Sequence, residues 1–211
     1  MKEKISKIYF GVLSLVVFVI VLLDVYLSAT NQYGLYQHAW QRTLNTLVFF
    51  TILSNVMVGI TSFILFRGKS IDNIKVHVIQ FCSFLCILVT GVVYHIMLAP
   101  DLNPTGMDAV TNFFLHTFIP IAYVLGWLFL IPRGSVNAKV LTYSLALPLG
   151  WLAFTLIKGP FVGFYPYPFM DVNYLGYLTA LINVVVIFVA AFILAMSLKY
   201  VDNWLSRRIR Q

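Results

Sequence analysis

Six long apolar runs constrain this chain more than any other feature of its sequence. They lie near residues 8–28, 44–66, 78–99, 110–131, 140–157 and 174–199. About 20 residues of helix, at ~1.5 Å per residue, cross the ~30 Å hydrocarbon layer of a bilayer. Lipid offers no partner for backbone N–H and C=O groups, so such runs fold as helices. The sequence therefore predicts an all-α, integral, multi-pass membrane protein with six transmembrane helices in one domain over residues 1–211.

The composition excludes a soluble globular domain. Hydrophobic residues make up 61% of the chain and charged residues only 10%, whereas soluble domains carry about 25% charged residues. The formal net charge is +7, but the basic residues lie at the ends of the apolar runs, where they indicate membrane topology. We therefore expect membrane lipids and no nucleic acid as partners.

The Lys and Arg residues alternate between the two sides of the predicted bundle. Twelve of the fourteen lie at the N-terminus, in the second and fourth loops and in the tail: Lys2, Lys4, Lys7, Arg67, Lys69, Lys75, Arg133, Lys139, Lys199, Arg207, Arg208 and Arg210. Only Arg42 and Lys158 lie on the other side. Because cytoplasmic loops are enriched in Lys and Arg, both termini are predicted to be cytoplasmic, with the cell membrane as the location.

The two ends of the chain and its cysteines admit simple interpretations. The first apolar run is long for a signal peptide and no clean cleavage site follows it, so we expect it to be retained. Cys82 and Cys86 are interpreted as small packing residues. The tail, residues 201–211, is interpreted as a cationic end that anchors the last helix; lying flat on the inner lipid surface is the alternative.

Strongly polar side chains gather toward the outer end of the predicted helices. They are Asp24, Thr51, Ser54, Asn55, His95, Asn112 and His116. Inside a membrane such a side chain must find a partner or water, so it marks a candidate functional site. At ~1.5 Å per residue, Thr51 lies about 10 Å and His116 about 9 Å below the outer boundary. The two side chains are therefore predicted to share one level on the second and fourth helices.

Spacing arranges these residues in two stripes. The three polar residues of the second helix lie three and four positions apart, so they share a face. Asn112, His116 and Pro120 recur every four residues along the fourth helix. Pro120 cannot donate to the carbonyl of His116, which bends the helix and leaves an acceptor near the site. A small polar pocket is therefore predicted between the second and fourth helices.

This pocket has residue types suited to ester hydrolysis. A hydroxyl becomes a good nucleophile when a neighbouring base takes its proton, and His is well matched to that task near neutral pH. Thr51 and His116 are therefore the candidate catalytic pair. Asn55 and Asn112 could donate to a developing oxyanion. Asp24 could orient an imidazole.

Further residues are assigned supporting or substrate-binding roles. His95 is a candidate supporting residue at the outer end of the third helix. Ser54, Tyr165 and Phe169 are candidate substrate-binding residues. The last two belong to a loop rich in Pro and aromatic residues, 159–171. This loop could form a lid over the pocket or re-enter the membrane interface, and the sequence does not decide between the two.

Structural roles and a metal site are the alternatives to catalysis for these polar residues. A Thr hydroxyl in a membrane helix commonly bonds the carbonyl four residues earlier, which for Thr51 is that of Leu47. His116 could serve only as a hydrogen-bonding residue in helix packing. Asp24, His95 and His116 could supply three metal ligands, but no dense ligand motif is present. We expect no metal and no cofactor.

Three sequence blocks resemble a known family. Residues 50–52 (Phe-Thr-Ile), 116–120 (His-Thr-Phe-Ile-Pro) and 167–171 (Tyr-Pro-Phe-Met-Asp) are similar to the androgen-induced-gene family of six-helix membrane hydrolases and its bacterial relatives. Animal members hydrolyse fatty acid esters of hydroxy fatty acids with a membrane-embedded Thr and His. The resemblance implies that Thr51 is the nucleophile and His116 the base, while Ser54 and Asn55 depart from the animal pattern.

The leading hypothesis is a membrane-embedded, threonine-dependent hydrolase of lipid esters that enter from the outer leaflet. A small transporter or proton-coupled permease is the first alternative, with Asp24, His95 and His116 as a relay. A non-catalytic lipid-binding or assembly protein is the second, in which the polar residues only lock helix packing.

Overall fold

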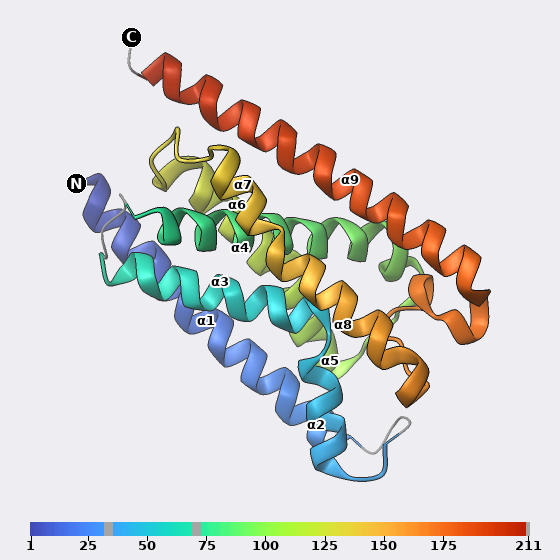
Figure 1. The fold of residues 1–211 in the computed structure, drawn as a ribbon. Helices are drawn as coiled ribbons and strands as arrows, with labels where there is room; N and C mark the ends of the chain where they lie inside the picture. The colour runs from blue at the N-terminus through green and yellow to red at the C-terminus, as the bar shows by residue number, and fades with distance from the viewer. Residues whose placement is uncertain (32–35, 69–72, 210–211) are drawn as a thin grey trace. The chain divides into compact units, whose positions relative to one another are not determined.

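The structure is a computed structural model that describes residues 1–31, 36–68 and 73–209, and these residues form helices joined by short connections (Figure 1). Five segments are long and apolar enough to cross a membrane: Lys2–Thr30, Ile74–Asp101, Gly106–Leu130, Ala138–Val162 and Val172–Arg208. A bent helix pair adds a sixth candidate span. The predicted all-α, multi-pass membrane fold is confirmed. Lys69 and Arg210 of the charge count lie outside the described residues.

The helices follow the predicted runs with shifted ends. They are α1 (Lys2–Thr30), α2 (Ala39–Leu47), α3 (Phe50–Phe66), α4 (Ile74–Val93), α5 (Gly106–Phe113), α6 (Ile119–Leu130), α7 (Ala138–Ser144), α8 (Ala146–Val162) and α9 (Val172–Ile209). Short π-helical turns η1 (Tyr94–Leu98) and η3 (Phe114–Phe118) and 3₁₀ turns η2 (Ala99–Asp101) and η4 (Pro168–Met170) lie between them. The chain divides into two compact units, Met1–Ile131 and Pro132–Gln211, and each is described by itself. The predicted single domain stays a prediction.

The second span is broken rather than continuous over 44–66 as expected. Helices α2 and α3 meet at an angle of 69°. The Arg42 guanidinium donates to the carbonyl oxygens of Ser28 at 3.2 Å and Ala29 at 2.7 Å, in the last turn of α1. The Thr46 hydroxyl bonds the Ser28 hydroxyl. These contacts satisfy carbonyls that the end of α1 leaves without helical partners, and they hold α2 across that end.

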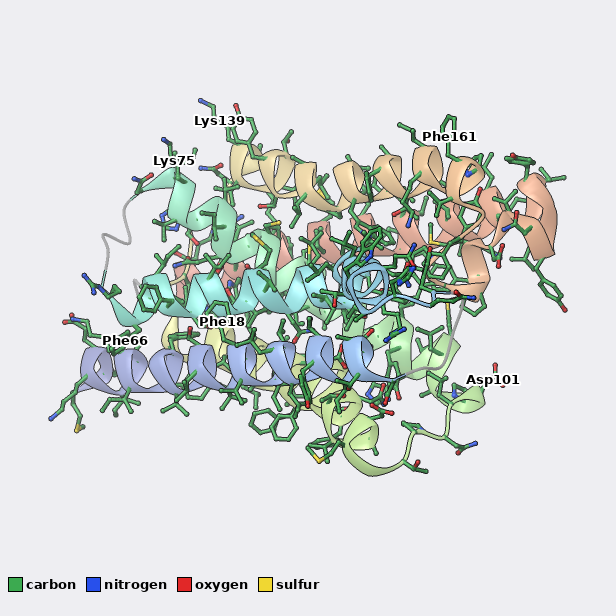
Figure 2. All side chains as sticks on the ribbon, turned by 90° about the horizontal axis from the view of Figure 1, so that it is seen from below. Phe18, Phe66, Lys75, Asp101, Lys139 and Phe161 are labelled. Carbon is green, nitrogen blue, oxygen red and sulfur yellow. The ribbon has the colours of Figure 1, made fainter. Side chains whose placement is uncertain are left out.

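Close contact between α1 and α3 depends on small residues. A Cβ on Gly11 would lie 2.8 Å from the Phe66 ring, and one on Gly59 would lie 3.0 Å from the Phe18 ring. Figure 2 labels both phenylalanines along this contact. The Ser14 hydroxyl donates to the Gly59 carbonyl at 2.9 Å. Small residues and interhelical hydrogen bonds are the usual means of helix association in lipid.

Gly126 allows a similarly close contact between α6 and α1, which a substitution can test. A Cβ at Gly126 of α6 would lie 2.6 Å from Tyr9 and 3.1 Å from Phe10 of α1. We expect Gly126→Ala to lower the free energy of unfolding by roughly 1–3 kcal/mol, because the buried Phe10 ring and the half-buried Tyr9 ring must move. Gly150→Ala in α8 is the matched control: outside its chain neighbours and the backbone of its own helix, no atom lies within 4 Å of its Cβ position. Thermal unfolding in detergent should separate the two, and equal midpoints would contradict the packing described.

In the second unit, the Pro and aromatic loop is folded onto its own neighbours. Tyr165 is buried and its ring covers Gly159 of α8. The Asn183 amide of α9 donates to the Phe169 carbonyl at 2.9 Å, and the Tyr167 and Phe169 rings stack with centroids 5.3 Å apart. The loop therefore has a defined packing against α8 and α9.

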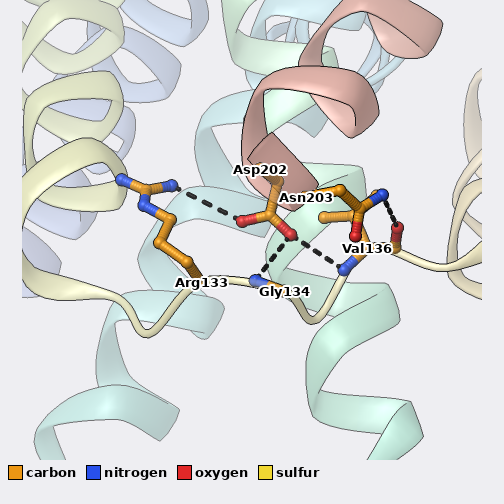
Figure 3. A network of polar contacts seen from close by, with 5 residues as sticks. All are labelled: Arg133, Gly134, Val136, Asp202 and Asn203. Carbon is orange, nitrogen blue, oxygen red and sulfur yellow. Dashed lines mark hydrogen bonds and ion pairs between the residues drawn. The ribbon is translucent and has the colours of Figure 1, made fainter. Parts of the chain in front are cut away.

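A buried carboxylate joins α9 to the segment before α7. The Asp202 side chain is 1% exposed, and its Oδ2 accepts from the backbone N–H groups of Gly134 at 3.0 Å and Val136 at 3.1 Å (Figure 3). Its Oδ1 lies 3.8 Å from Nη1 of Arg133, whose side chain is 6% exposed. Asn203 donates to the Val136 carbonyl at 3.5 Å. These contacts fix the rotation of the C-terminal part of α9 within the second unit.

Candidate active site

Thr51 and His116 form a hydrogen-bonded pair. The Thr51 Oγ1 on α3 lies 3.2 Å from the His116 Nε2 on η3. The Thr51 side chain is buried and the imidazole is half-buried. A hydroxyl within hydrogen-bond reach of an imidazole nitrogen is the arrangement that general-base activation requires. The two residues that the sequence placed at one level are thus brought into direct contact.

The second ring nitrogen fixes the proton arrangement of His116. Its Nδ1 lies 3.0 Å from the backbone carbonyl oxygen of Asn112. A carbonyl oxygen can only accept, so Nδ1 carries the proton. In the neutral ring Nε2 then has a lone pair directed at the Thr51 hydroxyl, which donates to it. The imidazole is therefore oriented as a base toward Thr51, with a backbone carbonyl as its orienting group.

A π-helical turn positions this imidazole. Residues Phe114–Phe118 form the turn, which the Ile119 N–H closes onto the Phe114 carbonyl. Pro120 follows at once and has no N–H for the His116 carbonyl, so the regular α-helical pattern cannot run through this point. A Cβ on Gly91 of α4 would lie 3.2 Å from Pro120 and 3.5 Å from the His116 carbonyl oxygen. Single π turns of this kind often occur at functional sites.

The break between α2 and α3 places Thr51 in the first turn of a helix. Helix α3 begins at Phe50, with Phe49 as its N-cap. The N-terminal end of a helix carries a partial positive charge that stabilises nearby negative charge. Thr51 therefore lies where a developing alkoxide is favoured, rather than in the middle of a continuous helix as the sequence suggested.

Three buried polar side chains hold the first turn of α3. Asn55 is fully buried and donates to the carbonyl oxygens of Thr51 at 2.8 Å and Leu115 at 3.1 Å. Ser54 donates to the Thr51 carbonyl at 3.0 Å and bonds the Thr90 hydroxyl at 2.8 Å. Both amide protons of Asn55 are thus engaged with backbone, so an oxyanion role would require one of these bonds to open. In this geometry Asn55 and Ser54 hold the first turn of α3, and their predicted oxyanion and substrate-binding roles stay predictions.

Tyr94, like Thr90, is a residue at this site that the sequence patterns did not indicate. Its ring stacks on the His116 imidazole with centroids 4.0 Å apart and planes inclined by 21°. The Asn112 amide donates to the Tyr94 hydroxyl oxygen. Tyr94 begins the other π turn, η1. No spacing along the chain connects position 94 with position 116, so only the fold reveals the stacking.

No family model, curated protein or solved structure matches this chain. Its function is therefore inferred from the geometry of its own residues.

The remaining predicted polar residues, His95 and Asp24, have partners other than Thr51 and His116. His95 is exposed, and its Nε2 lies 3.1 Å from the Thr117 Oγ1. Asp24 on α1 faces Thr111 and Asp108 of α5. The orienting group at His116 Nδ1 is the Asn112 carbonyl rather than a carboxylate.

Tyr165 and Phe169 lie in the second unit. Tyr165 is buried against α8 and Phe169 stacks on Tyr167. Their predicted contact with substrate stays a prediction. Among the residues that the structure describes, no group of three or more His, Cys, Asp or Glu side chains could hold a metal ion.

A second buried polar cluster lies farther along α3 and α4. The Thr61 and Ser83 hydroxyls are 2.8 Å apart, and Tyr123 of α6 donates to the Gln80 carbonyl at 3.2 Å. All four side chains are at most 2% exposed. Single hydroxyls in apolar runs give a weak sequence signal, so this cluster was not predicted. Gln80, a strongly polar residue in an apolar run, was the one signal that could have indicated it.

Proposed function

We propose that this protein is a membrane-embedded hydrolase of lipid esters, with Thr51 as nucleophile and His116 as base. The observation that carries the proposal is the chain of contacts from Thr51 Oγ1 to His116 Nε2 at 3.2 Å and from His116 Nδ1 to the Asn112 carbonyl at 3.0 Å. This nucleophile–base–orienter arrangement recurs in hydrolases of unrelated folds.

The proposed reaction has two halves. Thr51 Oγ1 attacks the ester carbonyl carbon while its proton passes to His116 Nε2. The tetrahedral intermediate collapses, the C–O bond to the alcohol breaks, and the imidazolium returns the proton to the leaving alcohol. Water then attacks the acyl-threonine with His116 again as base, and the carboxylic acid leaves as Thr51 regains its proton. The residues described supply every proton transfer in this scheme.

Tyr94 is the proposed oxyanion donor. Its hydroxyl oxygen accepts from Asn112, and a phenol has one further proton to donate. Because the Tyr94 ring stacks on the His116 imidazole, the Tyr94 hydroxyl is held in a fixed position relative to the base. A preorganised donor at the developing oxyanion is commonly a large contribution to catalysis.

Removing the Tyr94 hydroxyl tests this role. We expect Tyr94→Phe to lower kcat by about 10²-fold, because loss of one oxyanion donor typically costs 10²–10³-fold. The ring remains to stack on His116, so KM should change little, while the unfolding temperature should fall modestly because the Asn112 amide loses its acceptor. Tyr26→Phe, which removes an exposed tyrosine hydroxyl, is the control. An unchanged kcat in Tyr94→Phe would remove Tyr94 from the mechanism.

A lipid ester is the proposed substrate, since the pair lies on helices that could cross a membrane. The resemblance of residues 50–52, 116–120 and 167–171 to the androgen-induced-gene family supports fatty acid esters of hydroxy fatty acids as candidates. The distribution of Lys and Arg supports cytoplasmic termini in the cell membrane and entry of substrate from the outer leaflet.

The direct test is turnover and trapping of the acyl group. The purified protein in detergent is incubated with short-chain acyl esters and a fatty acid ester of a hydroxy fatty acid, then quenched with acid. We expect release of acid and an acyl mass on the peptide that contains Thr51. An inert protein across the panel, or an acyl group on another residue, would contradict the proposal.

A proton-coupled transporter is the second candidate, favoured by the buried hydroxyl pairs along α3 and α4. Ser54 bonds Thr90 at 2.8 Å, and Thr61 bonds Ser83 at 2.8 Å farther along the same helices. Polar groups at several depths are typical of proton paths. Thr61→Val should abolish proton-coupled flux if the protein is a transporter, and leave ester hydrolysis nearly unchanged if it is a hydrolase.

A further inference from the structure

The C-terminal part of α9 carries a groove of about 310 Å³ on one face. Six residues line it: Met196, Lys199, Tyr200, Asn203, Trp204 and Arg207. Their spacing of three and four positions places them on a single helical face. The lining therefore combines two cations with a phenol, an indole and an amide, all of which donate hydrogen bonds, and one apolar side chain.

The groove lies where α9 changes from apolar to charged. Gly176 interrupts the helix with a φ of 71°. Residues 177–198 contain no charged side chain, and at ~1.5 Å per residue these 22 positions span about 33 Å, close to one hydrocarbon layer. Lys199 is the first charged residue after this run. The groove residues from Lys199 onward are thus placed at the depth of lipid headgroups, where Trp and Tyr are also favoured.

The cations of the groove are not neutralised by protein carboxylates. Within the described part of the chain, the ion pairs join Lys7 to Glu3 and Arg133 to Asp202. Asp202, the acidic residue nearest along α9, is buried and accepts from backbone N–H groups. Arg208 lies over the Trp204 ring at 4.6 Å and orients it. Lys199 and Arg207 are therefore available to an external anion.

We propose that this groove binds the phosphate of an anionic phospholipid. Lys199 and Arg207 would contact the phosphate, with Arg207 offering a planar fork of donors. Tyr200, Asn203 and Trp204 donate to its oxygens or to the headgroup hydroxyls, and Met196 contacts the start of the acyl chains. Asp202 and Asn203, bonded to residues 134 and 136, hold the face of α9 in the required rotation.

Lipid titration followed by native mass spectrometry tests this site. The full chain in mild detergent is titrated with phosphatidylglycerol, and separately with phosphatidylcholine and inorganic phosphate. We expect one retained phosphatidylglycerol, weaker phosphatidylcholine binding and no retained phosphate. Lys199→Gln combined with Arg207→Gln should weaken phosphatidylglycerol binding about 30-fold, from the usual contribution of two basic residues at an anionic surface.

Matched variants separate a defined site from general charge attraction. Lys75→Gln combined with Lys139→Gln removes the same charge from exposed positions outside the groove and should change affinity less than about threefold. If the double variant fails to fold, Arg207→Gln alone, at an exposed position, serves as the test variant. We expect it to weaken phosphatidylglycerol binding about fivefold. Equal losses in the groove and control doubles, unchanged binding in both, or equal retention of inorganic phosphate would overturn the proposal. The test does not depend on ester hydrolysis.

Discussion

Thr51→Ala and His116→Ala are each expected to lower kcat/KM for ester hydrolysis about 10³-fold or more, with the fold intact. The first removes the attacking oxygen and the second the group that takes its proton at 3.2 Å. Since a nucleophile and its base act as a unit, the double variant should be little worse than either single one. Thr51→Ser keeps a hydroxyl and should retain measurable turnover.

The protein contains a matched control for this pair. His95 of η1 and Thr117 of η3 also form a Thr–His contact, at 3.1 Å, but with an exposed imidazole. We expect His95→Ala and Thr117→Ala to change kcat/KM by less than about threefold, because exposed side chains outside the site contribute little. Circular dichroism and unfolding temperature establish that all variants are folded. If the two pairs of variants behave alike, the assignment of Thr51 and His116 fails.

Asp202→Ala is expected to lower the free energy of unfolding by about 3–5 kcal/mol, the usual cost of removing one partner of a buried ion pair. The change removes the acceptor of the Gly134 and Val136 N–H groups as well as the charge beside Arg133. Burial lowers the pKa of the Arg133 guanidinium from its ordinary value, and the Asp202 charge opposes that shift. Without the carboxylate, the N–H groups of Gly134 and Val136 lose their acceptor and Arg133 loses the nearby negative charge.

Two further variants define the origin of this effect. Asp202→Asn keeps an oxygen for the backbone donors but loses the charge, so it should cost less than Asp202→Ala. Asp101→Ala, at an exposed carboxylate, should stay within about 0.5 kcal/mol of the wild type. Unfolding of the full chain in detergent, followed by circular dichroism, measures all three. A midpoint for Asp202→Ala equal to that of the wild type would show that the network in Figure 3 does not stabilise the fold.

Much of the candidate site followed from local patterns. Four-residue spacing placed Asn112, His116 and Pro120 on one stripe, and Pro120 predicted a disturbed helix at His116, where the structure has a π turn. Depth counting put Thr51 and His116 at one level. These inferences succeed because they use only the rise of a helix and the missing N–H of proline, both of which are local properties.

Other parts of the site could not be read from local patterns. The predicted continuous helix over 44–66 is instead bent by 69° between α2 and α3. No Pro or Gly marks the bend; the contacts of Arg42 with the end of α1 hold α2 in place. Asn55 donates to the Thr51 and Leu115 carbonyls, which no local pattern indicated, and its predicted oxyanion role stays a prediction. Both outcomes depend on residues distant in the chain.

The sequence by itself determined the membrane-spanning class, the positions of the apolar runs and the gathering of polar residues at one level. It could do so because hydrocarbon thickness and backbone hydrogen bonding act on each segment separately. Only the tertiary structure decided that Nε2 of His116 faces Thr51, that Tyr94 stacks on the imidazole and that Asp202 joins residues 134 and 136. These are contacts between helices, and their partners are chosen by packing and by the need to satisfy buried polar groups, which no short stretch of sequence contains.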